Sequence, residues 1–142
     1  MAIKRVAPPE AADLLQQGWT YVDVRSIPEF EEGHPAGAYN VPFLHRGPSG
    51  MSPNPDFLAV MTRAFSPDRT LVLGCRSGNR SLRAAELLVQ HGYRQIVEMR
   101  GGYLGETGPG GATVCEGWKT LGLPSATAAE PGRAYHDLKE NE

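Results

Sequence analysis

Residues 70–75, TLVLGC, constrain the fold more than any other part of this 142-residue chain. The run is apolar without alternation, which is typical of a strand covered on both faces of a parallel sheet. A short loop of small and basic residues follows, and residues 81–91 then repeat apolar side chains at helical spacing. A buried strand that leads through a short loop into a helix predicts one unit of a parallel α/β sheet.

Other segments repeat this alternation of strands and helices. The patterns predict strands over residues 3–6, 19–25 and 95–99, and helices over 8–17, 55–65 and, shorter, 116–121. The length suits a single domain with a real core. We therefore expect a three-layer α/β/α fold with a mainly parallel sheet of about five strands. This domain would span residues 1–123, and residues 124–142 read as a loose polar tail.

Composition excludes several classes of protein. The formal net charge of −2 gives no reason to expect nucleic acid or an anionic membrane as the main partner. No apolar stretch approaches the length of a membrane span, and the first residues lack the apolar core of a signal peptide. Two cysteines without CxxC spacing do not make a disulfide scaffold. We expect a cytoplasmic protein with reduced thiols.

Cys75 stands where a parallel sheet binds ligands, at the carboxyl end of a strand and before a helix. The backbone N–H groups of the loop can converge on an anion, and the helix N-terminus adds positive potential. Arg76 and Arg80 add full charges. All of these favour a thiolate over a thiol. The alternative is a small buried structural cysteine, but the sequence favours a nucleophile.

The loop CRSGNRS (75–81) resembles the active-site loop of the rhodanese sulfurtransferases. Three further stretches resemble the same family: YVDVRSIPEFEEGHPAGAYNVPF (21–43), MRGGY (99–103) and GWKTLGLP (117–124). The ordered matches cover residues 6–124, most of the chain. The resemblance implies the rhodanese-like three-layer fold and a sulfurtransferase activity.

The family's chemistry implies a persulfide on Cys75. Its thiolate would take the outer sulfur of a small donor such as thiosulfate and pass it to a thiol or to cyanide, with a protein thiol as a further acceptor. The substrate-binding residues would be those of the loop: Arg76, Ser77, Gly78, Asn79, Arg80 and Ser81. This chemistry needs no metal or cofactor, and the four histidines lack ligand spacing. His34 would fix the long connection after the second strand.

Asp23, Arg25 and Glu29 are the candidates for organising the site. Asp23 and Arg25 end a strand on the same sheet edge as Cys75, where they would either hold the loop through charge-assisted hydrogen bonds or form an internal ion pair. Glu29 would pair with a loop arginine or face water. Arg76 is expected to be exposed, and Arg80 to point inward to a carboxylate.

The sequence departs from the family pattern after the double glycine, where residues 103–117 form a glycine-rich insertion. A mobile surface loop is expected there, with no GK[ST] that would make it a phosphate-binding loop. Cys115 lies in this insertion. It could reach Cys75 and act as a resolving thiol, or it could be a small packing residue.

Two alternatives of other classes stay open. A sulfur-carrier or interaction module, loaded by a protein partner, would also need Cys75 and a small anion-binding loop. A phosphatase or arsenate reductase of the same fold would need a longer loop: Cys75 and Arg80 are separated by four residues, whereas the phosphatases of this fold have five. The shorter ring of donors suits a single sulfur better than a tetrahedral oxyanion.

Overall fold

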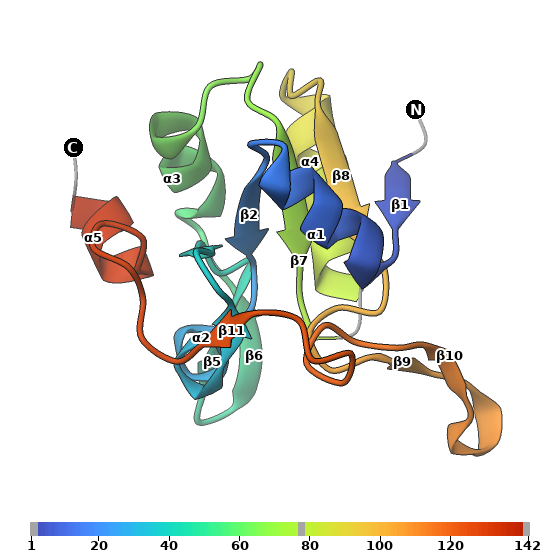
Figure 1. Cartoon of the computed structure of the whole chain (residues 1–142). Coiled ribbons are helices and arrows are strands. Elements are labelled where there is room, and N and C mark those ends of the chain that lie inside the picture. Colours follow the sequence, from blue (N-terminus) through green and yellow to red (C-terminus); the bar gives the residue numbers. More distant parts are fainter. Residues whose placement is uncertain (1–2, 77–78, 141–142) are drawn as a thin grey trace.

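The computed structural model describes residues 3–76 and 79–140 and is built around a five-stranded sheet (Figure 1). Every strand pair in this sheet is parallel, which confirms the expected fold class. The strands, in spatial order, are β1 (Lys4–Val6), β8 (Ile96–Met99), β7 (Leu71–Gly74), β2 (Thr20–Asp23) and β4 (Tyr39–Asn40). The apolar run that includes β7 is thus the central strand, as its lack of alternation predicts.

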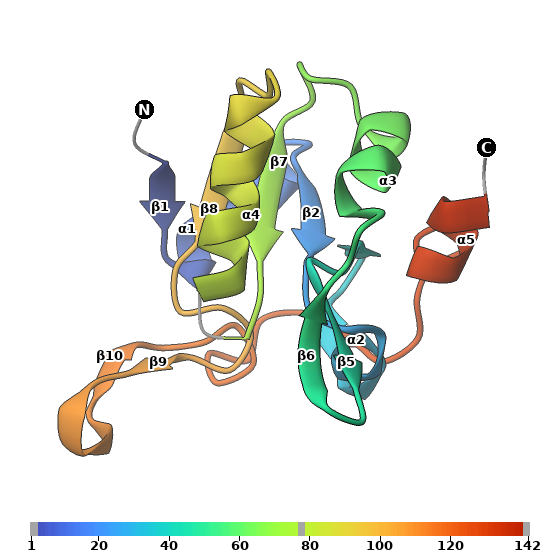
Figure 2. The same cartoon turned by 180° about the vertical axis from the view of Figure 1, so that it is seen from behind.

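Helices cover both faces of the sheet. Helix α1 (Pro8–Gln16) packs on one face (Figure 1), and α3 (Phe57–Ala64) and α4 (Asn79–Gln90) pack on the other (Figure 2). The two-residue period of a strand divides β7 between two cores. Leu71 and Leu73 join the core under α3 and α4, and Val72 joins the core under α1.

Several short elements gather at the carboxyl edge of the sheet or project beyond it (Figure 1). The short helix α2 (Ile27–Glu32) follows β2. Three antiparallel pairs are formed by β3 (His34–Pro35) with β11 (Ser125–Ala126), β5 (Leu44–Gly47) with β6 (Gly50–Pro53), and β9 (Glu106–Thr107) with β10 (Thr113–Cys115). The expected loop of the insertion is therefore an arm of two strands joined through a 3-10 turn, η1 (Pro109–Gly111), and it projects from the body (Figure 1).

The prediction of a short helix over residues 116–121 is wrong. This segment forms turns. The backbone N–H groups of Trp118 and Lys119 donate to the carbonyl oxygens of Gly102 and Tyr103 (both 3.0 Å), and the buried Trp118 indole donates to Pro124 O at 2.8 Å. These bonds attach the segment to the double-glycine turn.

The expectation of a loose tail after Pro124 is also wrong. Residues 125–126 form β11, and α5 (Tyr135–Glu140) packs beside α3. Tyr135 and Leu138 lie in the core with exposed fractions of 4% and 8%, and the Tyr135 hydroxyl accepts a hydrogen bond from Asn54 Nδ2 at 3.0 Å. Two apolar residues in a polar segment are too weak a periodic signal to predict this packing. Within the described residues, no helix is long and apolar enough to cross a membrane.

Candidate active site

Cys75 lies at the carboxyl end of the central strand, as the sequence predicts. The segment after β8 holds the start of its loop: Tyr103 N donates to Cys75 O at 2.7 Å, and Leu104 N donates to Arg76 O at 3.0 Å. Gly102 makes this approach possible. Its φ is +62°, and a Cβ there would overlap the Cys75 carbonyl oxygen. The double glycine therefore positions the loop that carries the thiol.

The Cys75 side chain is buried, with 1% of the residue exposed, and it points toward the first turn of α4. The Ser81 hydroxyl lies 3.3 Å from Cys75 Sγ and is itself buried. The same hydroxyl also bonds to the Glu98 carboxylate of β8. Ser81 therefore contacts the sulfur directly.

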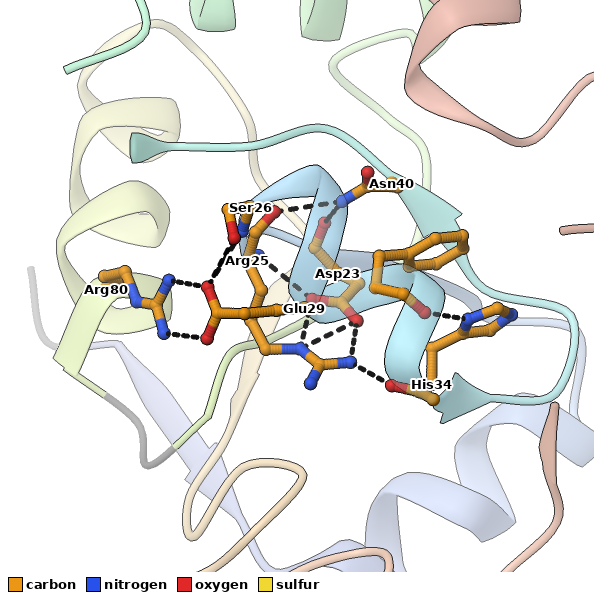
Figure 3. Close-up of polar contacts among 9 residues, drawn as sticks. Asp23, Arg25, Ser26, Glu29, His34, Asn40 and Arg80 are labelled. Atoms are coloured by element: carbon orange, nitrogen blue, oxygen red, sulfur yellow. Dashed lines mark hydrogen bonds and ion pairs between the residues drawn. The ribbon is translucent and has the colours of Figure 1, made fainter. Parts of the chain in front are cut away.

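The loop arginines point in different directions. Arg76 is exposed, whereas Arg80 is half-buried and makes a two-point ion pair with Glu29 of α2, at 2.7 and 2.9 Å (Figure 3). Both orientations agree with the sequence-based expectation. Asn79 is exposed at the start of α4. The predicted binding residues Ser77 and Gly78 lie outside the described residues.

Glu29 has an unusually complete set of donors. Besides Arg80, the backbone N–H and the hydroxyl of Ser26 donate to it at 3.1 and 2.8 Å, forming a capping box at the start of α2. Burial raises the pKa of this carboxyl, but the hydrogen bonds from Arg80 and Ser26 outweigh it and lower the pKa to about 2. The pair is therefore a charged clamp between α2 and the start of α4.

Asp23 and Arg25 form the internal ion pair that the sequence allows. Arg25 Nη2 donates to Asp23 Oδ2 at 2.7 Å and to the Gly33 carbonyl at 2.5 Å, with both side chains buried (Figure 3). Asn40 Nδ2 donates to the backbone carbonyls of Asp23 and Arg25, both at 3.0 Å. The group locks the long connection against the end of β2, beside the site.

His34 has the structural role expected of it. Its Nδ1–H donates to Phe30 O at 2.7 Å, and its ring stacks on the Phe30 ring with centroids 3.7 Å apart. Both residues are buried. Among the described residues, no group of three or more His, Cys, Asp or Glu side chains could hold a metal ion.

Two cavities meet at Arg76. One, of about 310 Å³, carries the cations Arg25, Arg46, Arg76 and Lys119 and the carboxylates Glu29 and Glu32. The other, of about 490 Å³, lies between Arg5, the start of α4 and the β9 strand of the insertion. Arg46 and Lys119 were missed by the sequence reasoning, because nothing in their local pattern links them to Cys75. The lining is rich in cations, which suits an anionic substrate.

Glu98 is a further residue that the sequence reasoning missed. It is fully buried, and Arg5 Nε donates to its Oε1 at 2.6 Å. A signal was available, since Glu98 is the one acidic residue inside the apolar run QIVEM. Burial raises the pKa of its carboxyl above the ordinary value, against the lowering effect of the bonds from Ser81 and Arg5.

Cys115 lies at the base of the projecting arm, next to Gly101. In the part of the chain that the structure describes, neither cysteine forms a disulfide. The Cys115 thiol faces the carbonyl oxygens of Arg100 and Glu116 at 3.6 and 3.7 Å, and burial raises its pKa. These surroundings favour the packing interpretation of Cys115, and its role as a resolving thiol stays a prediction to be tested.

Comparison with known proteins gives one family. The Rhodanese-like domain family matches residues 7–105. The chain is 40% identical to "Thiosulfate sulfurtransferase 16, chloroplastic" of Arabidopsis thaliana over 81% of this chain and 86% of that protein. It is 29% identical to "Thiosulfate sulfurtransferase GlpE" of Haemophilus influenzae over 90% and 99% of the two chains. With two other plant relatives, the match spans 51% and 53% of their length.

A solved structure shows the same arrangement. The crystal structure of Rv0390 from M. tuberculosis superimposes with a TM-score of 0.74 and 28% identity, over 90% of this chain and all of that one. The inserted arm and the segment that carries α5 lie after the last residue matched by the family model.

Proposed function

Because the chain belongs to the rhodanese-like domain family, we propose that it is a sulfurtransferase that carries sulfane sulfur as a persulfide on Cys75. One observation carries the proposal: a cysteine at the carboxyl end of the central strand opens the loop into α4, beside a cation-lined cavity. The relatives from Arabidopsis thaliana and Haemophilus influenzae described above are both named thiosulfate sulfurtransferase, which supports thiosulfate as the donor.

The reaction has two steps. The Cys75 thiolate attacks the outer sulfur of thiosulfate, an S–S bond to Cys75 forms, and the S–S bond of the donor breaks with its electron pair leaving on sulfite. The persulfide then gives its terminal sulfur to cyanide, forming thiocyanate, or to a thiolate, forming a new persulfide. Cys75 is regenerated as the thiolate in either case. The steps are covalent catalysis by an activated nucleophile.

The loop residues have separate tasks in this proposal. Arg76 lines both cavities, and its exposed guanidinium attracts the doubly charged donor. The Ser81 hydroxyl bonds to the sulfur that carries the charge. The Glu29–Arg80 clamp fixes the start of α4, so the loop keeps its shape when the sulfur is loaded. Asp23 and Arg25 position the neighbouring connection.

The geometry gives less support to a phosphatase or arsenate reductase. Such an enzyme needs the last arginine of the loop to hold the oxyanion, but both terminal nitrogens of Arg80 are bonded to Glu29. A sulfur-carrier module loaded by a protein stays the second candidate, because it would use the same cysteine and loop.

Thiocyanate formation from thiosulfate and cyanide tests the proposal. We expect turnover that saturates with thiosulfate, together with no release of phosphate from a phosphate ester and no reduction of arsenate. Slow single loading of the protein without turnover would favour the carrier module, and phosphate release would contradict the proposal.

A further inference from the structure

Glu98 lies in the interior of the sheet, in a place where a carboxylate is costly. It pairs in register with Arg5 of β1 and Leu73 of β7, and its residue is 0% exposed. Ile96, two residues earlier on the same strand, belongs to the core under α3 and α4, so Glu98 faces α4 as well. Nothing in the sulfur-transfer steps described above uses this carboxyl group.

A continuous set of polar contacts joins Glu98 to the nucleophile. Glu98 Oε2 bonds to the Ser81 hydroxyl, and Ser81 Oγ lies 3.3 Å from Cys75 Sγ. All three residues are buried. A hydroxyl carries one proton, so Ser81 donates to one of these neighbours and accepts from the other. An ionised Glu98 therefore draws the Ser81 proton away from sulfur, and a neutral Glu98 leaves it for sulfur.

The two carboxyl groups bonded to α4 differ in what supports their charge. Glu29 accepts two hydrogen bonds from Arg80 and two from Ser26. Glu98 accepts one from Arg5 and one from Ser81, and it is more deeply buried. With fewer donors and less water, the charged form of Glu98 is the less favourable of the two. Burial is the largest influence on the pKa of Glu98 and raises it.

We propose, on the basis of the function proposed above, that Glu98 is a positioning residue that holds the proton of Cys75 through Ser81. In the step, the S–H proton passes from Cys75 to Ser81 Oγ while the Ser81 hydroxyl proton passes to Glu98 Oε2. The products are a Cys75 thiolate, an intact Ser81 hydroxyl and a neutral Glu98 carboxylic acid. No group is oxidised or reduced, and the site keeps one negative charge.

The neutral acid has a consequence for sulfur transfer. With the proton on Glu98, the contacts run from the Glu98 O–H to Ser81 and from the Ser81 O–H to the sulfur anion. Thiosulfate then approaches a thiolate beside a neutral Glu98, instead of a thiolate beside a second negative charge on Glu98. Among the described residues, the charged groups near Glu98 include Arg5 of β1 and the Arg100–Glu106 pair at the base of the arm, with Cys75 reached through Ser81. Tyr21 of β2, whose pKa is raised well above its ordinary value by burial, stays neutral.

Infrared difference spectroscopy of the protonated carboxyl C=O stretch tests the proposal directly. At neutral pH the wild type should show a buried protonated carboxyl, and its loss in Glu98→Gln would assign it to Glu98. The absorption should also disappear in Cys75→Ser, because a neutral hydroxyl no longer competes with Glu98 for ionisation. Alkylating Cys75 in the wild-type protein should remove it in the same way and needs no variant to fold.

Two outcomes would overturn the proposal. An absorption that survives loss of the Cys75 charge would mean that burial alone keeps Glu98 neutral, and no absorption in the wild type would mean an ordinary carboxylate paired with Arg5. Ser81→Ala tests the link: the pH dependence of Cys75 alkylation should move upward by about one unit, as expected for one lost hydrogen bond to an anion. An unchanged profile contradicts Ser81 as the link. The infrared result does not depend on turnover, so it separates this proposal from failure of the sulfurtransferase activity.

Discussion

The two cysteines of this chain differ in their surroundings. In the sequence, Cys75 precedes the double glycine and Cys115 follows it. Gly102 packs against the Cys75 carbonyl, and Gly101 packs against Cys115. Cys75 is buried at the start of a loop into a helix, with a hydroxyl at its sulfur. Cys115 ends a strand of the projecting arm and faces only backbone carbonyl oxygens with its thiol, among the contacts described for it.

The proposed function attributes the reactivity of Cys75 to its placement in the fold and not to its exposure. Cys115 is the more exposed thiol, but burial raises its pKa and favours the protonated form. Cys75 is less exposed, but a helix N-terminus, a hydroxyl donor and a cation-lined cavity surround its loop. Reactivity toward an anionic donor is expected only at Cys75.

The largest effect is expected from removing each thiol in turn. Cys75→Ser should reduce thiocyanate formation to background with the fold intact, because the change removes the nucleophile but little volume. Cys115→Ser is the matched control and should keep the wild-type rate. Steady-state assays and thermal melting of both variants measure this. A folded Cys75→Ser variant with more than trace activity would contradict the proposal that Cys75 is the nucleophile.

A second prediction compares the Glu29–Arg80 ion pair beside the Cys75 loop with the Arg100–Glu106 ion pair at the base of the arm that carries Cys115. Glu29→Gln should lower the free energy of unfolding at neutral pH by about 3 kcal/mol, since the Glu29 pKa of about 2 lies below the ordinary value of 4.5. This stabilisation is complete above the unfolded pKa and is lost as the pH falls from 4.5 toward about 2, so the variant and the wild type should converge in acid.

Glu106→Gln is the control in the arm. Its pair with Arg100 is 3.1 Å long and partly exposed to solvent, so little or no change in unfolding free energy is expected. Chemical denaturation at several pH values measures both variants. Equal losses of unfolding free energy in the two variants would show that the Glu29–Arg80 pair stabilises the fold no more than an ion pair of the arm does.

A smaller effect is expected at Arg76. Arg76→Ala should raise the KM for thiosulfate about fivefold with little change in kcat, as expected for the loss of roughly 1 kcal/mol of screened attraction. The increase should shrink at high salt. Arg94→Ala removes the same charge at the opposite end of the sheet, where Arg94 pairs with Asp68, and should leave KM unchanged. If both variants behave alike, Arg76 acts only through net charge.

The smallest effect is expected from oxidation of Cys115. Its raised pKa and its contacts with backbone carbonyls predict no Cys75–Cys115 disulfide after mild peroxide without reductant. Peptide mapping of the wild type and of Cys115→Ser measures the crosslink. A crosslink that is present in the first and absent in the second would establish Cys115 as a resolving thiol.

Local patterns in the sequence were enough to predict the parallel sheet and the position of Cys75. The uninterrupted apolar run before Cys75 and the helical spacing after it are local signals, and β7 and α4 follow them. The inward orientation of Arg80 agrees with the expectation, because a half-buried charge needs a partner. The partner, Glu29, lies 51 residues away, and only the fold brings the two together.

The errors have one physical cause. Residues 116–121 have a helical pattern, but the segment is held as turns against the double glycine by bonds from the N–H groups of Trp118 and Lys119 to the carbonyl oxygens of Gly102 and Tyr103, which are distant in sequence. The segment with Tyr135 reads as polar, yet two of its residues complete the core under α3. Glu98 is unusual in its strand, but its link to Cys75 depends on Ser81 of another element. Tertiary contacts, which local patterns do not encode, decided each case.

Sulfur transfer to Cys75 can be measured by mass spectrometry of the intact protein and of its peptides after incubation with thiosulfate. We expect a mass gain of one sulfur atom on the peptide that contains Cys75, none on the peptide that contains Cys115, and loss of the added sulfur on treatment with cyanide. Sulfur found on Cys115, or on neither cysteine while thiocyanate is formed, would contradict the proposed function.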